Sequence, residues 1–522
     1  MNLHDLFAIP CRRAPGKLAL VAEPGTAGLT YEELFDRARR LALGLGRKGI
    51  GKGDRVAFFL GNRVEFVVAY LAVLALGAVL VPINLAYRRR EIAHMLGDAE
   101  PKLLFTETDQ LPVWAELAPE ERGGVEVILA EELDDLATPA IPVIPATTPT
   151  DLPPLPIVDG GDLAMLLYTS GTTGRSKGAM LSHDNVLATV TGLLAAWAWE
   201  REDVLLLTLP LFHTHGLVVG LTTALAAGAT VHLHRRFDAA RVAADLGVPA
   251  APAGGEVPRP TLFFGVPTMY VRLVEALRQT GAGSALGRLR LCCSGSAPLS
   301  PETFAAFQER TGHAILERYG MTETGMNLSN PYAGPRVPGQ VGTPLPGVSI
   351  RIVTWEEPVG KDRPAGEEGE LLVRGSNVFS GYWRAPQKTA ESFVHDALGR
   401  RWFKTGDLAR RDPATGAVTL LGRSSELILS GGFNVYPREV EEVLAAYPGI
   451  REAAVVGRPH PEWGEVPVAF LVAEGELDEA ALLAYCKGQL AGFKVPRTFR
   501  YLASLPRNAL GKVQKHRLGE EA

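Results

Sequence analysis

The chain has 522 residues, more than one ordinary hydrophobic core accommodates, so it is expected to form several structural units. Its 46% hydrophobic and 21% charged residues are typical of globular proteins, and a net charge of −5 argues against nucleic acid as a partner. The four cysteines, Cys11, Cys292, Cys293 and Cys486, match no zinc-binding spacing, and the expected absence of disulfides suits a reducing cytoplasm.

Helices and strands alternate along the first part of the chain. Thr30 and Glu33 have the spacing of a capping box, which predicts the start of a helix. A strand, a helix, a strand, a helix and a strand are then expected at 55–60, 64–76, 78–82, from 89 onward and at 102–106. Gly77 and Pro82 interrupt the apolar stretch 66–83, which therefore predicts a buried helix and strand and no integral membrane segment. This alternation is typical of a mostly parallel sheet.

The segment 168–179, YTSGTTGRSKGA, carries more chemical information than any other. It follows the apolar run 163–168, which is expected to be a buried strand, and its glycines let the backbone turn tightly against a ligand. Exposed N–H groups, several hydroxyls and the ammonium of Lys177 predict a polyphosphate site rather than a plain surface loop. It is not a Walker loop, because Lys177 is followed by Gly178 and not by serine or threonine.

A proline-rich connector and a domain boundary divide the remaining sequence. Residues 138–156 contain seven prolines and are expected to be an exposed connector. Ser182 is expected to cap the helix that follows the glycine-rich segment. Later strands are expected at 229–233, 261–267 and 289–295, with a surface insertion at 247–260. We predict a large domain at 1–422 and a small α+β domain at 423–522, in which Pro437 begins a helix.

Five further segments carry hydroxyls, glycines and charges in a fixed order: SGSAP (294–298), ERYGMTETG (317–325), WFKTGDLA (402–409), LLGRSSELI (420–428) and LPRNALGKVQKHRL (505–518). Together with the glycine-rich segment they resemble the adenylate-forming superfamily of acyl-CoA synthetases, firefly luciferases and peptide-synthetase adenylation domains. The resemblance covers nearly the whole chain. It implies an α/β fold with a large N-terminal domain, whose mostly parallel sheets are flanked by helices, and a small mobile α+β C-terminal domain.

The resemblance also implies a role for each motif residue. The β- and γ-phosphates of ATP would be held by Thr169, Ser170, Gly171, Thr172, Thr173, Gly174 and Lys177. The adenine pocket would be lined by Ser296, Ala297, Pro298 and Tyr319, and the ribose would be bound by Asp407 and Arg423. Catalysis would rest on Thr322 at the α-phosphate, Glu323 on Mg²⁺, and Lys512 between the α-phosphate and the substrate carboxylate. A carboxylate that attacks a phosphate meets like charge, so Mg²⁺ and a lysine suit this reaction.

The implied reaction has two halves, with ATP and CoA as co-substrates. An acid and ATP first give an acyl-adenylate and pyrophosphate, and the thiol of CoA then displaces AMP. The small domain would rotate between the halves, so that the turn formed by Ser430, Gly431, Gly432 and Phe433 faces the pantetheine. The hinge position, two residues after Arg423, usually holds Asp or Lys in this superfamily and here is Ser425, a small residue that can still absorb a backbone rotation.

The acid is expected to be malonate. The segments 209–217, 263–270, 317–339 and 431–441 look like the malonyl-CoA synthetase branch. That branch carries its carboxylate-binding arginine at the position of Arg236, and bidentate pairing of arginine with a carboxylate suits the task. Arg290 is a weaker second candidate, Met321 is expected to shape the pocket, and His213 is expected at its mouth. A metal site at His213 and His215 lacks a visible third ligand.

Three other interpretations share some of these motifs. A medium- or long-chain fatty acyl-CoA synthetase differs only in the acyl pocket, where Arg236 disfavours it. A carrier-loading adenylation module is expected to continue into a carrier domain. A nucleotide-binding regulator without catalysis is disfavoured, because both Lys512 and Glu323 are present. The oligomeric state is left open by the sequence.

Overall fold

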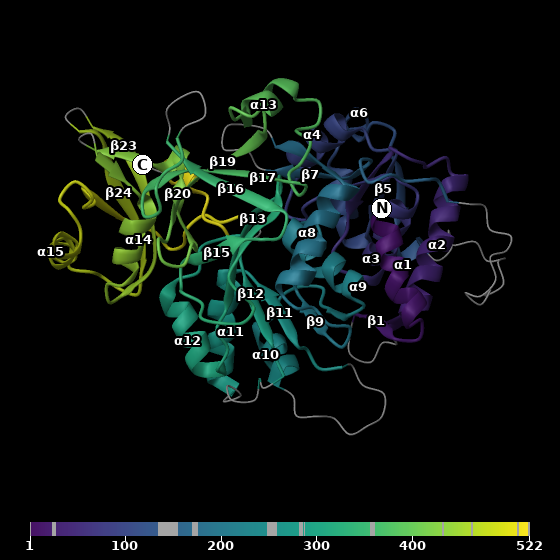
Figure 1. Ribbon diagram of the computed structural model, residues 1–522, viewed down its shortest axis with the longest axis horizontal. Helices are drawn as coiled ribbons and strands as arrows, with labels where there is room; N and C mark the ends of the chain where they lie inside the picture. The colour runs from purple at the N-terminus through teal and green to yellow at the C-terminus, as the bar shows by residue number, and fades with distance from the viewer. Residues whose placement is uncertain are drawn as a thin grey trace.

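The computed structural model describes residues 2–22, 28–133, 155–169, 176–247, 258–280, 286, 288–354, 361–430, 433–460, 463–508 and 511–519. Most of the expected connector and most of the expected insertion at 247–260 lie outside these residues. In Figure 1 the first half of the chain, in purple to teal, makes up one side of the molecule. The last hundred residues, in yellow-green, gather at the opposite end, so a large and a small unit are both present as predicted.

The first sheet has six strands, in the order β6 (Glu126–Leu129), β5 (Leu103–Thr106), β3 (Arg55–Phe59), β4 (Val79–Pro82), β7 (Leu163–Thr169) and β8 (Lys177–Ser182). All neighbours are parallel except β7 and β8. Its crossover helices include α3 (Val64–Ala75) and α4 (Arg89–Ala99). The predicted alternation of helices and strands is therefore confirmed for this part of the chain.

The helix α2 (Tyr31–Arg47) begins where the sequence predicts it. The hydroxyl of Thr30 accepts a hydrogen bond from the Glu33 backbone N–H at 3.2 Å, and the Glu33 carboxylate accepts one from the Thr30 N–H at 2.8 Å. These two bonds satisfy backbone groups that the first turn of a helix leaves unpaired. The capping box is therefore formed as predicted.

The second sheet has fourteen strands. The path runs β16 (Val348–Val353), β17 (Glu368–Gly375), β19 (Arg401–Arg411), β20 (Val418–Arg423), β15 (Gln340–Pro344), β14 (Gly325–Ser329), β13 (Leu316–Met321), β12 (Leu291–Ser294), β11 (Leu262–Gly265), β9 (Val204–Leu207), β10 (Thr230–Leu233), β1 (Leu18–Val21) and β2 (Leu29–Thr30), and β18 (Phe393–His395) pairs with β19. The strands from β13 to β1 are parallel, and those from β14 to β16 are antiparallel. The parallel strands end at one common edge, where α/β proteins place their ligands.

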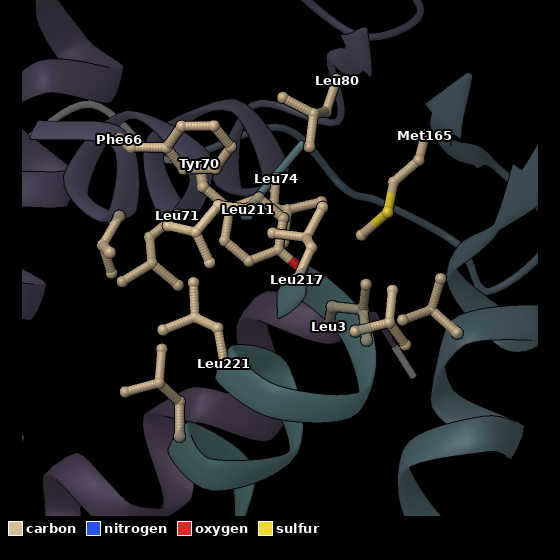
Figure 2. Close-up of a cluster of buried hydrophobic side chains, with 14 of the residues drawn as sticks. Leu3, Phe66, Tyr70, Leu71, Leu74, Leu80, Met165, Leu211, Leu217 and Leu221 are labelled. Atoms are coloured by element: carbon tan, nitrogen blue, oxygen red, sulfur yellow. The ribbon is translucent and has the colours of Figure 1, made fainter. Parts of the chain in front are cut away.

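The two sheets are joined through a buried layer of helices. Figure 2 shows Phe66, Tyr70, Leu71 and Leu74 of α3 packed close to Leu217 and Leu221 of the π-helix η3 (His215–Thr222), with Leu3 of α1 (Leu3–Arg13) nearby. The hydroxyls of Tyr70 and Thr222 lie 2.9 Å apart and share a hydrogen bond. Because α3 is buried nearly all round, its apolar run belongs to the core, and among the helices of the described residues none has the length and apolar character of a membrane span.

The small unit has its own sheet and core. Its strands are β22 (Phe433–Val435), β21 (Ile428–Ser430), β24 (Gly464–Ala473) and β23 (Ile450–His460), with β25 (Thr498–Tyr501) beside β24. The helices α14 (Pro437–Ala445) and α15 (Glu479–Gln489) cover one face, and Leu444, Leu471 and Leu482 are buried between them and the sheet. The tail buries Leu505 and Leu518 against the same sheet.

A three-residue 3-10 helix, η5 (Ser424–Glu426), links the two units. The Ser424 hydroxyl donates to the Gly406 carbonyl of β19 at 3.1 Å, so the first linker residue is attached to the large sheet. The carboxylate of Glu426 pairs with Lys515 of the tail at 3.2 Å, and Lys515 also pairs with Glu441 of α14 at 2.7 Å. The change from one sheet to the next thus falls beside residues 422 and 423, and the domain boundary predicted there stays a prediction.

Candidate active site

The predicted ribose pair lies on two adjacent antiparallel strands. Asp407 of β19 and Arg423 of β20 face each other in register, and Arg423 Nε lies 2.9 Å from Asp407 Oδ1. The hydroxyl of Tyr319 donates to the other oxygen of Asp407, and the guanidinium of Arg423 also donates to the Thr405 carbonyl at 2.7 Å. Burial raises the pKa of Asp407, and the charge of Arg423 opposes this rise. A carboxylate held this way keeps lone pairs free for the two hydroxyls of a diol.

The predicted magnesium carboxylate lies beside the glycine-rich segment. Glu323, in the turn between β13 and β14, is buried, and its Oε1 accepts a hydrogen bond from the Tyr382 hydroxyl at 3.0 Å. Burial raises the pKa of Glu323, while hydrogen bonds from Tyr382 and from the Thr169 side chain lower it. Thr322 precedes Glu323 in the same turn and is half-buried. These oxygen-rich surroundings fit a hard cation such as Mg²⁺.

The two described ends of the glycine-rich segment lie near Glu323 and its partner Tyr382: the Thr169 side chain hydrogen-bonds to Glu323, and Lys177 lies beside Tyr382. Thr169 ends β7, Lys177 begins β8, and the two residues are paired across the antiparallel strands. The Lys177 ammonium lies 5.7 Å from the centre of the Tyr382 ring. The predicted phosphate-binding residues Ser170, Gly171, Thr172, Thr173 and Gly174 lie outside the described residues, so their role stays a prediction.

Tyr382 joins this group although the sequence analysis did not single it out. Its only sequence signal is a Gly-Tyr-Trp run at 381–383, which alone does not distinguish a site residue from a packed aromatic. Its hydroxyl donates a hydrogen bond to Glu323, and the ammonium of Lys177 lies over its ring, so Tyr382 contacts both charged groups of the site. These contacts lead us to propose that Tyr382 positions Glu323 and Lys177 and does not itself react.

We expect the Tyr382→Phe variant to lower the rate of adenylate formation by about 10- to 100-fold, because a hydrogen bond to a charged group contributes about 1.5–3 kcal/mol. Loss of this donor raises the pKa of Glu323 further, so half-maximal rate should also require more Mg²⁺. Pyrophosphate release measured over a Mg²⁺ series checks this. Tyr501→Phe, on the exposed face of the small sheet, is the matched control, and an unchanged Mg²⁺ dependence in Tyr382→Phe would contradict the assignment.

The loop after β12 brings a strained serine to the edge of the sheet. Ser296 has a φ of +71°, a left-handed conformation that costs free energy for a residue with a side chain. Its hydroxyl lies 3.3 Å from Nδ1 of His215, the first residue of η3. Ala297 is half-buried and Pro298 is exposed. Such strain is typical of backbone held at a binding site, where the adenine contacts are predicted.

Two neutral histidines lie at the same edge. Burial lowers the pKa of His213 to about 4 and that of His215 well below its usual range, and the positive charge of Arg318 lowers both further. The backbone N–H of His215 donates to Nδ1 of His213 at 3.2 Å. At neutral pH both rings are therefore uncharged. Among the described residues no third metal-ligating side chain joins the two histidines.

Arg318 is a buried cation without a matching anion among the residues that the structure describes. It lies on β13, its residue is 5% exposed, and its Nε and Nη2 have no hydrogen-bond partner among the described residues. A Cβ at Gly295 would lie 2.5 Å from its Cζ, so the guanidinium lies directly against the loop before Ser296. In the part of the chain that the structure describes, no carboxylate comes within ion-pair distance of it. Alternation along β13 turns Arg318 away from Tyr319 and toward the histidines.

The structure contradicts the expected substrate role of Arg290. Its guanidinium forms a two-point ion pair with Asp203, with Nε at 2.7 Å, and donates to the Trp197 carbonyl at 3.0 Å. It also precedes β12, at the amino end of the strand, whereas the candidate site lies at the carboxyl end. Arg290 is therefore a structural residue that neutralises a buried aspartate.

The other two predicted acyl-site residues lie at the correct edge. Arg236 follows β10 at the carboxyl end of the strand and is exposed, while the preceding Arg235 pairs with Glu107 at 3.1 Å. Met321 is half-buried at the end of β13, and its sulfur accepts a weak hydrogen bond from Tyr319 at 3.8 Å. The positions of both residues are compatible with the predicted acyl pocket.

The tail brings Lys512 to the ribose pair. Desolvation and the charge of Arg423 lower the pKa of Lys512, and the carboxylate of Asp407 opposes this, so the three groups lie within electrostatic reach of one another. A Cβ at Gly511 would lie 2.8 Å from the Thr268 hydroxyl at the start of α11 (Pro267–Thr280), which places the tail against the large unit. The Lys512 backbone is fixed by two hydrogen bonds with Asn508, both 2.9 Å.

The predicted CoA-binding turn lies in the small unit. Ser430 ends β21 and is buried, and Phe433 begins β22, is exposed and stacks on Phe493 with ring centres 4.7 Å apart. Gly431 and Gly432 lie outside the described residues. An exposed aromatic ring next to a glycine pair is a surface that a ligand can contact, and its role with CoA stays a prediction.

The fold and the site together define an enzyme that joins an acid to a thiol through an adenylate. The AMP-binding enzyme family matches residues 7–383, and the C-terminal domain of AMP-binding enzymes matches residues 439–512. The chain therefore belongs to the AMP-binding enzyme family and is an AMP-forming acid–thiol ligase. This confirms the predicted superfamily, enzyme class and fold class.

Several relatives span nearly the whole chain. The mitochondrial malonate–CoA ligase ACSF3 of the mouse is 37% identical over 94% of this chain and 86% of its own length. The sulfoacetate–CoA ligase of Cupriavidus necator is 35% identical over 99% and 97%. Among solved structures, ATP-bound MatB of Rhodopseudomonas palustris is 40% identical with a TM-score of 0.87, covering 100% of this chain and 99% of that one. The apo form of the same protein, at 41% identity and with the same coverage, scores 0.78, so the arrangement here is nearer to the ATP-bound form.

Proposed function

We propose that the chain is a malonate–CoA ligase, which converts malonate, ATP and CoA to malonyl-CoA, AMP and pyrophosphate through malonyl-adenylate. The observation that carries this proposal is the buried guanidinium of Arg318 beside the acyl edge of the sheet, which in the described part of the chain has unpaired donors and no carboxylate partner. An uncompensated buried charge is costly, and the distal carboxylate of a short dicarboxylate would neutralise it. The similarity to malonate–CoA ligases supports the same acid.

In this proposal the residues of the site divide the work of the first half-reaction. Asp407 and Arg423 bind the ribose, Ser296, Ala297, Pro298 and Tyr319 enclose the adenine, and residues 169–177 hold the terminal phosphates. Glu323 holds Mg²⁺, whose charge screens the phosphates when it is bound. Thr322 contacts the α-phosphate. Lys512 lies between the α-phosphate and the proximal carboxylate of malonate, where it stabilises the charge that develops during attack.

The second half-reaction uses the small domain. We keep the proposed division at 1–422 and 423–522, with rotation of the small domain carrying Lys512 away and turning Ser430, Gly431, Gly432 and Phe433 toward the pantetheine of CoA. The linker η5 is the segment that would absorb the rotation. A cytoplasmic location stays a prediction, since the mouse relative is named as a mitochondrial enzyme.

Other acids differ in the charge that they present to Arg318. Sulfoacetate, which the Cupriavidus relative is named for, carries a second anionic group and would also neutralise the guanidinium. A medium- or long-chain fatty acid would bury the guanidinium against hydrocarbon, which costs several kcal/mol for an unpaired charge. A short acid with a second anion is therefore the best substrate class, and malonate is the member that the relatives favour.

A panel of acids tests the proposal. Pyrophosphate release should be measured with ATP, Mg²⁺ and each of malonate, methylmalonate, sulfoacetate, acetate, octanoate and palmitate. Malonate is expected to give the highest kcat/KM, and acetate, which lacks the second anion, is expected to be far poorer. A higher value for octanoate or palmitate than for malonate would overturn the dicarboxylate assignment, and a higher value for sulfoacetate would replace malonate within it.

The Arg236→Leu variant is expected to raise the KM for malonate far more than the KM for ATP, because an exposed cation at the pocket edge would attract a dianion. The neighbouring Arg235→Leu variant is a matched control, because Arg235 already pairs with Glu107. Steady-state pyrophosphate release with each substrate varied in turn checks this. Unchanged malonate kinetics in Arg236→Leu would remove this residue from the acyl site and leave Arg318 as the single cation proposed there.

A further inference from the structure

Two histidines and an aspartate converge on the face of the large sheet that α10 (Ala239–Gly247) covers. His232 and His234 are two residues apart on or beside β10, so both side chains point to the same face. Asp245 comes from α10, and its Oδ2 lies 2.9 Å from Nε2 of His234. One ligand atom from each of the three residues lies within 4.8 Å of the other two. The group is the one set of three such side chains among the described residues.

The two imidazoles are buried, but most of their ring nitrogens have no hydrogen-bond partner among the described residues. His232 is 4% exposed and His234 is 1% exposed. Both ring nitrogens of His232 and the Nδ1 of His234 have no hydrogen-bond partner in the described part of the chain. Buried polar groups are normally hydrogen-bonded, so unpartnered nitrogens that face a carboxylate need an explanation. Their rings lie edge to face with centres 4.8 Å apart, and one ligand atom from each ring lies within 4.8 Å of the carboxylate oxygen of Asp245.

We propose that His232, His234 and Asp245 bind one divalent transition-metal ion, with Zn²⁺ the best match. Two imidazole nitrogens and one carboxylate oxygen are a donor set that zinc takes, with water in the fourth position. Ligand atoms around tetrahedral zinc lie about 3.3 Å apart, which small rotations of the rings reach from the present separations. The Asp245 side chain is 21% exposed, so an ion and its water can enter from the α10 side.

The charge state of the cluster suits a metal. Asp245 supplies one negative charge to the group, while Arg241 on the same helix adds a positive one. The nitrogen ligands distinguish this site from the oxygen-rich surroundings of Glu323, which suit Mg²⁺. The ion would fix α10 to β10 just before Arg235 and Arg236.

Zinc binding to the whole protein tests the proposal. Chelator-treated protein should be titrated with Zn²⁺ by calorimetry without ATP, and the ligands of the bound ion counted by X-ray absorption. We expect one ion per chain with two imidazole ligands. His232→Ala and Asp245→Asn should each weaken binding by at least about 10- to 100-fold, since even the loss of an outer contact to a metal ligand weakens binding by that much. His395→Ala, on the exposed strand β18, is the matched control and should bind as the parent does.

Two results would overturn the proposal. One is a parent protein that takes up no zinc, which would show that the cluster is held by the His234–Asp245 contact alone. The other is zinc binding that survives both His232→Ala and Asp245→Asn, which would place the ion elsewhere. If His232→Ala fails to fold, Asp245→Asn decides the question, because Asp245 is a half-buried helix residue whose amide substitute keeps its size. Neither readout depends on the acid that the enzyme uses.

Discussion

The Lys512→Ala variant is expected to lose adenylate formation by about 100- to 1,000-fold while it largely keeps thioester formation from preformed malonyl-adenylate. Removing one preorganised donor to a developing negative charge costs about 2.7–4 kcal/mol of transition-state stabilisation. Lys512 lies within electrostatic reach of Asp407 and Arg423, so in the proposed mechanism its contribution is made in the adenylation step. Pyrophosphate release measures the first half, and CoA-dependent release of AMP from synthetic malonyl-adenylate measures the second.

Lys515→Ala provides the control for the tail. Lys515 pairs with Glu426 and Glu441, so its loss loosens the tail without removing a charge from the reacting groups. It should reduce adenylate formation far less than Lys512→Ala does. An equal loss of both half-reactions in Lys512→Ala would mean that this lysine supports the small domain and does not act on the α-phosphate.

The Arg318→Met variant is expected to lower kcat/KM for malonate by about 30-fold to several thousand-fold. Truncating one member of a buried charge pair costs about 2–5 kcal/mol, and in the proposed complex malonate supplies the other member. The KM for ATP should stay near that of the parent. The thermal midpoint of the protein without substrate should be unchanged or higher, because methionine removes a buried charge that has no carboxylate partner among the described residues.

Arg336→Met is the matched control and should have the opposite effect on stability. The Arg336 guanidinium donates to the carbonyls of Pro331, Ala314 and Tyr332 at 3.1, 2.5 and 2.7 Å. Its loss would leave these three carbonyl groups without their hydrogen-bond donor and should destabilise the fold by about 1–3 kcal/mol. If Arg318→Met destabilises the substrate-free protein as much as Arg336→Met and leaves malonate kinetics intact, Arg318 is structural and the dicarboxylate proposal loses its main support.

Features set by residues close together in the sequence were predicted correctly. The capping box at Thr30 and Glu33 and the helix start at Pro437 are set by contacts within one turn, and both are present. The antiparallel strands between Gln340 and Arg423 were not predicted strand by strand. Bulges shift their pairing between Glu370 and Leu372 and between Leu408 and Ala409, and such shifts break the regular alternation of buried and exposed residues.

Contacts between distant segments were harder to predict. Asp407 and Arg423 were recognised as motif residues, and their pairing follows once β19 and β20 are known to be antiparallel neighbours. Arg290 was misjudged because residue type alone does not tell which end of a strand a side chain occupies, and its partner Asp203 is 87 positions away. Arg318 lies in the motif 317–325 but was not assigned a role, because its role depends on its having no partner among the described residues of the folded chain.

The linker η5 would set the point about which the small domain turns in the proposed rotation. Ser424 remains bonded to β19, while Glu426 remains tied through Lys515 to α14, so Ser425 lies between one residue anchored to each body. A change of two torsion angles at Ser425 would turn the small sheet, its tail and Lys512 together without opening either anchor. In the proposed rotation, the pivot would be set by the backbone at Ser425 and by these two flanking contacts, and would need no charged side chain at that position.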